Sequence, residues 1–402
     1  MILFCGGIAL KTYGIVAEYN PFHNGHKYHI DMIRQSGGTH IVAVMSGNFV
    51  QRGDVAVLDK FTRARLAVEN GVDLIIELPT PYAVSTAETF ARGAVSILSD
   101  MNCIDGISFG CENDDIALLI ASAEASERIR NSDRLKEMLR EGENYPSAMA
   151  EIVGEEYPPE VAEIFSSPNN LLALEYIRQV NEKCGNSDIL PIKRTSVGHD
   201  SDDISGDFAS ASKIREMLSN GEDTQKFVPY GTFWGSETAQ LYSIKELEKV
   251  ILYRMRTMTA EEISRLPDVS QGLEGRIVNA VKSATTLDEL LSGIKTRRYP
   301  MARIRRIIIS ALLGVTSEDS TGNPPYARVL ALNDRGAEVL KKAKKSSVIP
   351  VSTSLAELCN FGEHAKRLAL LESDATDIYS LACRKAIPCK TDMTAKIEKT
   401  EN

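Results

Sequence analysis

The sequence predicts an α/β fold, with a Rossmann-like parallel sheet in the first half and a mainly α-helical C-terminal domain. Three observations support this prediction. Short apolar runs rich in β-branched residues alternate with helical patterns in the first half, and helical patterns dominate after about residue 240. The chain also has 402 residues, too many for one ordinary core. We therefore place two domains at residues 1–225 and 226–402.

The first half contains the elements of βαβ units in order. Its apolar runs predict strands at residues 13–19, 39–45, 72–78 and 103–109. Helical patterns separate these strands at residues 26–35, 59–70 and 86–98. Such alternation is typical of a parallel sheet covered on both faces. Residues 189–194 are a candidate fifth strand.

The remaining segments are read mainly as helices. Residues 115–180 have helical patterns, and after a polar loop at 198–207 a helix starts at Ser210 or Ser212. Further helices are expected at residues 243–258, 260–265, 272–284, 286–294 and 301–313. The apolar first ten residues lack a basic region and a cleavage signal, so we interpret them as an extension before the first strand. The last ten or so residues, rich in Lys, Thr and Glu, are expected to be frayed.

Composition indicates a cytoplasmic globular protein without a membrane partner. Hydrophobic residues make up 43% and charged residues 25% of the chain, and no apolar stretch approaches the roughly 20 residues that span a bilayer. The seven cysteines are scattered without a CxxC pair, and no HExxH occurs. We therefore expect idle thiols in a reducing compartment and no protein-bound metal.

Charge divides the chain into two parts. Residues 1–224 carry 19 basic and 34 acidic residues (−15), whereas residues 225–402 carry 27 basic and 21 acidic residues (+6). A basic second half is compatible with a polyanionic partner, and equally with an ordinary mixed-charge helical surface.

The strongest local signal lies between the first strand and the first helix. Residues 18–26 read Glu-Tyr-Asn-Pro-Phe-His-Asn-Gly-His. His23 and His26 are three residues apart, so at a helix start both imidazoles can point the same way. Unpaired N–H groups at that end favour an anion. The pattern predicts a site that stabilises charge on an α-phosphate. The alternative is a histidine pair beside an ordinary turn.

This segment resembles the HxGH signature of nucleotidyltransferases and HIGH-type aminoacyl-tRNA synthetases. Enzymes of that class usually have a second, Ser/Thr-rich turn ending in Ile-Arg, and residues 208–215 read Phe-Ala-Ser-Ala-Ser-Lys-Ile-Arg. Its hydroxyl and N–H groups can bind phosphate oxygens, with cationic side chains adding charge. We expect catalytic roles for His23, His26, Lys213 and Arg215, and ATP contacts from Ser210 and Ser212.

Within this class the sequence is most similar to the bacterial tRNA(Met) cytidine acetate ligase family. The similarity is carried by residues 13–26, 47–53, 108–112, 167–176, 192–194 and 297–306. It implies that the enzyme activates acetate with ATP to acetyl-adenylate and pyrophosphate. It also implies transfer of the acetyl group to the wobble cytidine of elongator tRNA(Met), giving N4-acetylcytidine. The family begins near Lys11, so the first ten residues depart from it.

The resemblance implies an ATP site made of the first motif and three later residues. These residues are Tyr13, Gly14, Ile15, Val16, Ala17, Glu18, Tyr19, Asn20, Pro21, Phe22, His23, Asn24, Gly25, His26, Gly110, Asn169 and Arg194. Their chemistry agrees, because Gly110 would let a nucleotide approach the backbone, Asn169 can read an adenine edge, and Arg194 can pair with phosphate. A turn glycine, a helix cap and a surface ion pair are the alternatives at these three positions.

Three further expectations complete the predicted site. Residues 47–52 follow the neighbouring strand and could help form the acetate pocket. Cys111 could carry an acetyl group, but an idle buried thiol is the better interpretation. Magnesium is expected to arrive with ATP, since no carboxylate cluster forms a dedicated site.

A basic segment near residue 300 is the candidate tRNA contact. Six cations fall within twelve residues around Tyr299, whose ring could stack an unpaired base. We assign tRNA binding to Arg297, Arg298, Arg303 and Arg306, and the alternative is a solvated helix face.

Two rival functions remain open. One is a nucleotidyltransferase that joins a nucleoside triphosphate to a small phosphorylated metabolite, although such enzymes usually lack a basic helical second half. The other is an RNA-binding protein without catalysis, against which the intact histidine and Ser-Ala-Ser-Lys-Ile-Arg motifs argue.

Overall fold

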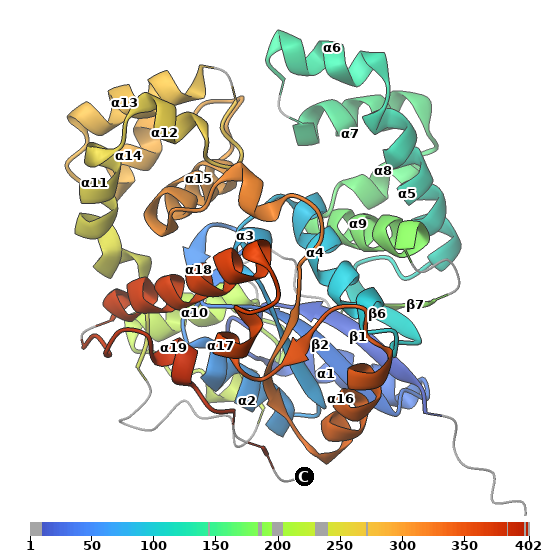
Figure 1. Cartoon of the computed structure of the whole chain (residues 1–402). Coiled ribbons are helices and arrows are strands. Elements are labelled where there is room, and N and C mark those ends of the chain that lie inside the picture. The colour runs from blue at the N-terminus through green and yellow to red at the C-terminus, as the bar shows by residue number, and fades with distance from the viewer. Residues whose placement is uncertain are drawn as a thin grey trace, which may run out of the picture.

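The structure, a computed structural model, centres on one seven-stranded sheet. It describes residues 10–143, 145–183, 187–194, 204–229, 240–270, 272–383, 385–397 and 399–400. The first nine residues, Cys5, Cys184 and most of the loop at 198–207 lie outside these ranges. The strand order is β7-β6-β1-β2-β5-β8-β9. Helices cover both faces of the sheet (Figure 1). Two further groups of helices stand apart from it, at the upper left and upper right of Figure 1.

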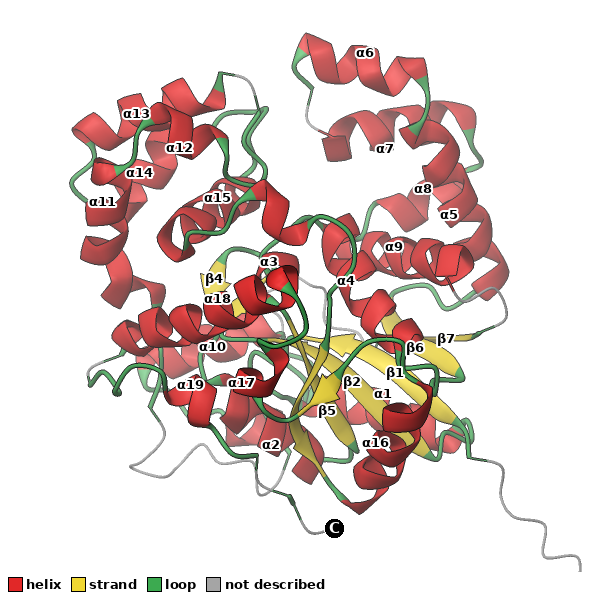
Figure 2. Cartoon of the chain, in the orientation of Figure 1, coloured by secondary structure: helices red, strands yellow, loops and turns green. Residues whose placement is uncertain are grey.

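The five strands predicted from the sequence form the parallel part of the sheet, as Figure 2 shows. They are β1 (Thr12–Ala17), β2 (His40–Ser46), β5 (Leu74–Leu78), β6 (Gly106–Cys111) and β7 (Asp188–Lys193). The predicted βαβ arrangement is therefore confirmed. β1 ends earlier than predicted because Tyr19 has a φ of 46°, a left-handed backbone conformation that does not continue a strand.

Helices pack on both faces of this sheet, which explains its long apolar runs. In β2, Ile41 and Ala43 belong to an apolar cluster with the helices of one face, whereas Val42 and Val44 belong to the cluster of the opposite face. The covering helices are α1 (Asn24–Gln35) and α2 (Lys60–Glu69) on the first face, and α4 (Ala87–Asp100) and α9 (Pro168–Lys183) on the second.

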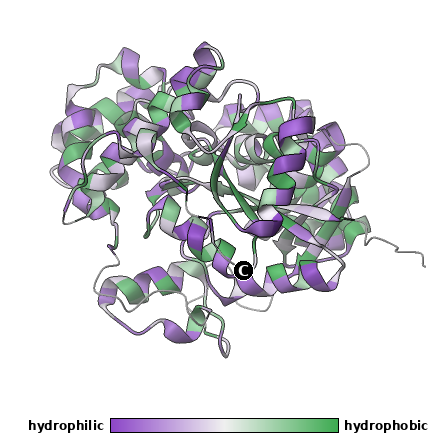
Figure 3. Cartoon of the chain, turned by 60° about the horizontal axis from the view of Figure 1, so that its bottom comes forward, coloured by the Kyte–Doolittle hydropathy of each residue, from purple (hydrophilic) through white to green (hydrophobic). Residues whose placement is uncertain are grey.

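The two outlying groups of helices match the helical patterns of the sequence. One group contains α5 (Ile116–Arg130), α6 (Asp133–Glu141), α7 (Tyr145–Glu156) and α8 (Pro159–Phe165). The other has its own apolar cluster and contains η2 (Ile244–Leu247), α11 (Glu248–Thr257), α12 (Ala260–Ser264), α13 (Leu273–Ser283), α14 (Leu287–Ile294) and α15 (Met301–Leu313). In Figure 3 the helices carry hydrophilic and hydrophobic residues side by side, as expected for elements with one buried face.

The end of the chain returns to the sheet. After η3 (Ser317–Ser320), β8 (Ala327–Leu332) pairs antiparallel with β5, and β9 (Val351–Ser352) pairs parallel with β8. The remaining elements are α16 (Asp334–Ser346), α17 (Leu355–Leu358), α18 (Glu363–Tyr379), η4 (Ser380–Ala382) and α19 (Thr391–Thr394). The region after residue 225 is mainly helical, as expected, yet it also supplies two strands. The division at 225/226 stays a prediction.

The expectation of a frayed tail is wrong for its described residues. Met393 and Ile397 pack against the large apolar cluster of the sheet, and the side chain of Asp392 is buried. Apolar contacts therefore hold a segment whose composition, rich in Lys, Thr and Glu, suggested solvent exposure.

Short elements fill the connections near one edge of the sheet. They are the hairpin β3 (Phe49–Val50) and β4 (Asp54–Val55), the helices α3 (Thr80–Ala83) and α10 (Ala211–Asn220), and η1 (Gln225–Phe227). Gly53 turns the hairpin with a φ of 72°, and a Cβ there would lie 2.4 Å from the Arg305 carbonyl carbon. The hairpin therefore packs directly against α15. In the described part of the chain, no helix combines the length and the apolar character that crossing a membrane requires.

Candidate active site

The predicted site segments meet where the parallel strands end. The connection from β1 to α1 holds the two histidines, and β2 leads into the β3–β4 hairpin beside it. β6 and β7 pair side by side up to Cys111 and Lys193, so Gly110 and Arg194 lie together. Ligands of open α/β sheets bind at this edge of the sheet.

The histidine turn fixes both imidazole rings. His23 is the N-cap of α1, and its Nδ1 accepts a hydrogen bond from the Gly25 amide at 3.0 Å. His26 Nδ1 accepts from the His23 amide at 3.2 Å, and the two rings stack with centroids 3.8 Å apart. Since backbone N–H groups only donate, the proton of each neutral ring lies on Nε2. The turn thus carries two neighbouring Nε2–H donors, for which no described residue provides an acceptor.

Burial keeps these rings neutral. Burial, together with the nearby guanidinium groups of Arg194 and Arg215, lowers the pKa of His23 to about 3. Burial and the neighbouring His23 hold the pKa of His26 well below its usual range. Tyr19 packs edge-on against the His26 ring at a centroid distance of 4.9 Å. Near neutral pH both histidines are therefore hydrogen-bond donors without a charge of their own.

Two glycines of the first motif have different structural roles. A Cβ on Gly25 would lie 2.9 Å from Cε1 of His23, so glycine lets that ring lie against the backbone. A Cβ on Gly14 would lie 2.7 Å from Leu98 Cδ1 on α4, so this glycine permits close packing of β1 against a helix. The structure thus gives Gly14 a packing role.

The second motif docks onto the histidine turn. Ser210 is the N-cap of α10 and accepts from the Lys213 amide at 3.1 Å, which confirms the predicted helix start. Arg215 donates to the Asn20 carbonyl at 2.6 Å and to Ser212 Oγ at 3.1 Å. The Lys213 ammonium lies 3.1 Å from Glu216. Of the predicted cations, Arg215 therefore touches the turn directly.

Asn24 adds a second link between the turn and this segment. Its amide donates to the carbonyls of Asp207 at 2.7 Å and of Lys226 at 3.0 Å. Residues on both sides of α10 are thereby held beside the start of α1. The two motifs, far apart in the sequence, form one surface.

Glu112 organises the third part of the site. Its carboxylate accepts from Asn169 Nδ2 at 2.6 Å and from Ser167 Oγ at 2.5 Å. It also lies 3.7 Å from Nε of Arg194, a nitrogen that is buried without a hydrogen bond. A Cβ on Gly110 would sit 3.4 Å from Arg194 Cγ. Gly110, Asn169 and Arg194 are thus brought together, as predicted, by a carboxylate to which sequence analysis gave no role.

The segment after β2 is fixed to the histidine turn. The Gln51 amide donates to Glu18 Oε1 at 2.8 Å. Arg63, fully buried, donates to the carbonyls of Glu18 at 2.5 Å and Ser46 at 3.2 Å, and also to that of Gly47. One guanidinium group therefore joins the ends of β1 and β2. Residues 47–52 lie beside the turn, as an acetate pocket there would require.

The basic segment near residue 300 divides into exposed and internal arginines. Arg297 and Arg298 are exposed, and Arg297 pairs with Glu143 of the other helical group at 3.0 Å. Arg303 donates to the Asp268 carbonyl at 2.7 Å, and Arg306 pairs with the Asp268 carboxylate at 2.7 Å. Binding of tRNA by these residues stays a prediction. The suggested stacking role of Tyr299 is wrong, because its ring is buried in the helical core.

Two further groups bear on the chemistry of the site, namely the thiol of Cys111 and any side chains that could bind a metal ion. Cys111 is fully buried, and burial raises the pKa of its thiol to about 12, so it would not form a thiolate near neutral pH. Among the described residues, no group of three or more His, Cys, Asp or Glu side chains could hold a metal ion.

Comparison with known proteins places this geometry in a family. Residues 10–393 match the family model described as HIGH Nucleotidyl Transferase. A protein of Acetivibrio thermocellus named tRNA(Met) cytidine acetate ligase is 36% identical over 393 residues, covering 92% of this chain and 94% of its own length. A protein of Clostridium kluyveri with the same name is 37% identical and covers 92% of this chain and 95% of its own.

Solved structures agree with the sequence relatives. The crystal structure of apo Thermotoga maritima TmcAL superimposes with a TM-score of 0.90 at 26% identity, covering 98% of this chain and 100% of that one. The same protein bound with alpha-thio ATP gives a TM-score of 0.88 at 27% identity with the same coverage. The similarity extends further toward the C-terminus than the sequence motifs indicated.

Proposed function

Because the chain belongs to the HIGH nucleotidyl transferase family and, within it, to the tRNA(Met) cytidine acetate ligases, we propose that it acetylates a tRNA with acetate and ATP. It would activate acetate as acetyl-adenylate and transfer the acetyl group to the wobble cytidine of elongator tRNA(Met). The product would be N4-acetylcytidine. The observation that carries this proposal is the pair of neutral Nε2–H donors at the start of α1.

In the first step, a carboxylate oxygen of acetate attacks the α-phosphorus of ATP. The bond from this phosphorus to the bridging oxygen breaks, and pyrophosphate leaves. His23 and His26 donate to the α-phosphate oxygens as charge develops on them, with Arg215 and Arg194 adding positive charge nearby. The donors are already fixed by backbone hydrogen bonds, so they need little reorganisation in the transition state. Magnesium would arrive bound to the ATP phosphates and neutralise part of their charge.

In the second step, the N4 amine of cytidine attacks the acetyl carbonyl carbon. The bond from that carbon to the phosphate oxygen breaks, AMP leaves, and the amine loses one proton. No covalent enzyme intermediate is needed, which is consistent with the buried, protonated thiol of Cys111. The hairpin at residues 47–55 adjoins Glu18, and we propose that it encloses the acetate and the mixed anhydride.

For the tRNA we propose a path past the basic segment. Arg297 and Arg298 are exposed just before α15, Arg297 reaches Glu143 of the other helical group, and both suit phosphate contacts. We give Arg303 and Arg306 a smaller role, because their guanidinium groups already bind the turn at Asp268. A cytoplasmic location follows from the proposed substrate.

The direct test is incorporation of labelled acetate into tRNA by the purified protein. We expect ATP-dependent label in elongator tRNA(Met), recovered as N4-acetylcytidine, and none in a matched transcript with uridine at the wobble position. Pyrophosphate release that requires a small phosphorylated metabolite instead of acetate would favour the nucleotidyltransferase alternative. RNA binding without turnover would favour a non-catalytic RNA-binding protein.

A further inference from the structure

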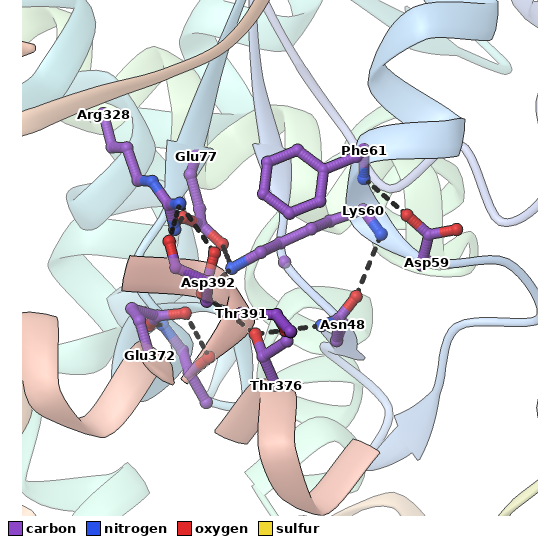
Figure 4. Close-up of polar contacts among 12 residues, drawn as sticks. Asn48, Asp59, Lys60, Phe61, Glu77, Arg328, Glu372, Thr376, Thr391 and Asp392 are labelled. Carbon is purple, nitrogen blue, oxygen red and sulfur yellow. Dashed lines mark hydrogen bonds and ion pairs between the residues drawn. The ribbon is translucent and has the colours of Figure 1, made fainter. Parts of the chain in front are cut away.

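A sealed network of charges lies beneath the hairpin that follows β2 (Figure 4). Lys60 contacts Glu77 at 2.6 Å and Asp392 at 2.7 Å, and Arg328 contacts the same carboxylates at 2.8 Å and 2.6 Å. All four side chains are at most 2% exposed. Two cations and two carboxylates compensate each other, so the cluster itself offers no free charge to a ligand.

The network depends on the end of the chain. Asp392 lies on α19, whereas Lys60 begins α2, 332 residues earlier. Without Asp392, the two buried cations would share one carboxylate. Replacing such a cluster by apolar residues is often neutral or stabilising, so stability alone is a weak reason to have it. A role in fixing the position of a neighbouring segment is better supported, because hydrogen bonds through Thr376 connect the cluster to the loop that follows β2.

Those contacts lead to Asn48. Thr376 on α18 donates to Asp392 Oδ2 at 2.9 Å and accepts from Asn48 Nδ2 at 3.2 Å. Asn48 Oδ1 in turn accepts from the Lys60 amide at 2.9 Å. The Asn48 side chain is 3% exposed, so these bonds are shielded from water. The amide nitrogen of Asn48 is therefore bonded to Thr376, and its amide oxygen to the backbone of Lys60, so both ends of this side chain are fixed.

Gly47 and the hairpin depend on the same contacts. A Cβ on Gly47 would lie 2.9 Å from Glu77 Oε1, so the network is packed directly beneath the loop. The Asn48 carbonyl accepts from the Ala56 amide at 2.9 Å, which closes the base of the hairpin. On its far side the hairpin donates from Gln51 to Glu18 at 2.8 Å. The hairpin is thus fixed between the network and the strand that leads into the histidine turn.

We propose that Asp392, acting through Thr376 and Asn48, is a positioning residue that holds the hairpin at residues 47–55 over the acetate side of the active site. The identity of the substrate in this inference rests on the proposed function, whereas the positioning of the hairpin does not. The C-terminal segment would thereby complete the acetate pocket without touching ATP. Disturbing it should weaken acetate binding and leave ATP binding in place.

Thr376→Val provides the cleanest test, since it removes the hydroxyl that joins Asp392 to Asn48 and keeps all four charges. We expect the KM for acetate in adenylate formation to rise about tenfold, with the KM for ATP nearly unchanged. The melting temperature should fall by only a few degrees, because the buried Asn48 Nδ2 loses one hydrogen-bond partner. Thr376→Ser should restore the wild-type values. Thr394→Val, on an exposed position of α19, is the matched control. Equal changes in both KM values, or none, would overturn the proposal.

Hydrogen exchange separates this proposal from the proposed function. In Thr376→Val, the amides of Gln51, Ala56 and Lys60 should exchange on the order of tenfold faster, while those of α5 are unaffected. Asp392→Asn should show the same pattern if it folds. If the wild type fails to activate acetate but the hairpin amides respond as expected, the function is wrong and the positioning role stands. Unchanged exchange at the hairpin would refute the positioning role itself.

Discussion

The histidine turn and the buried ion network lie on opposite sides of the β3–β4 hairpin. They differ in whether their polar groups are left available to a ligand. The turn holds His23 and His26 neutral, with their Nδ1 atoms bonded and their Nε2–H donors left for a ligand. The network holds four full charges that satisfy one another and are closed to water. The first arrangement can respond to charge that develops on a substrate. The second can only keep neighbouring segments in place.

The comparison predicts that breaking the network affects stability most. Arg328→Met leaves Glu77 and Asp392 with one cation, so an uncompensated carboxylate remains buried. We expect a loss of about 3–5 kcal/mol in the free energy of unfolding, measured by urea denaturation. Arg265→Met, which removes an exposed pair with Glu261, should cost less than about 1 kcal/mol. Similar small losses in both variants would mean that the network does not behave as a buried ion cluster.

Breaking the histidine turn should affect catalysis instead of stability. His26→Ala removes one donor to the α-phosphate, and we expect the rate of adenylate formation to fall by about 10²–10³-fold or more. Affinity for tRNA should stay within about twofold, because the substitution removes no positive charge and leaves the arginines of the basic segment in place. His40→Gln is the matched control, since His40 is buried at the start of β2, the opposite edge of the sheet. Near-normal turnover of His26→Ala would refute the phosphate-stabilising role.

The pH dependence of stability tests the surroundings of Glu372, a buried carboxyl group beside the ion network. Burial, with Glu77 and Asp392 nearby and Lys60 opposing them, raises the pKa of Glu372 to about 8 from 4.5. The folded protein then binds this proton more tightly than the unfolded chain, so stability should fall as pH rises from about 4.5 to about 8. Glu372→Gln should remove this contribution, and its melting temperature relative to the wild type should rise between about pH 4.5 and pH 8, with no further rise above that range. A constant difference would contradict the shift.

The smallest expected effect concerns the arginines of the basic segment. Arg297→Ala should weaken tRNA binding by about 1 kcal/mol or less and reduce the salt dependence of the binding constant by roughly one ion, with no change in stability. Arg303→Ala should instead lower stability, since its side chain packs over Tyr299 at 5.2 Å and bonds to Asp268. Filter binding across salt concentrations and thermal unfolding distinguish the two. Equal effects on binding would place both residues on the tRNA path.

The sequence predicted the parallel sheet and the histidine turn because both depend on neighbouring residues. β-branched runs indicate buried strands, and a cap residue and the next turn of helix lie within a few positions of each other. The start of α10 at Ser210 was predictable for the same reason.

The features that sequence analysis missed depend on distant partners. β8 was not predicted, since its pairing partner β5 lies about 250 residues earlier and Arg328 interrupts its apolar run. Asp392 lies where the tail predicted to be frayed begins, and nothing local shows that Lys60 and Arg328 lie beneath it. Glu112 entered the sequence analysis only within residues 108–112, which carry the family similarity, since its partners Asn169 and Ser167 come from a distant part of the chain. For Arg303 and Arg306, the internal partner Asp268 lies in a separate turn.

The central claim is that the histidine turn catalyses attack of acetate on the α-phosphate of ATP. Isotope exchange between pyrophosphate and ATP, measured without tRNA, tests it most directly. We predict exchange that requires acetate in the wild-type protein and is lost in His26→Ala, with His40→Gln near normal. Exchange that proceeds without acetate, or at the wild-type rate in His26→Ala, would contradict the account.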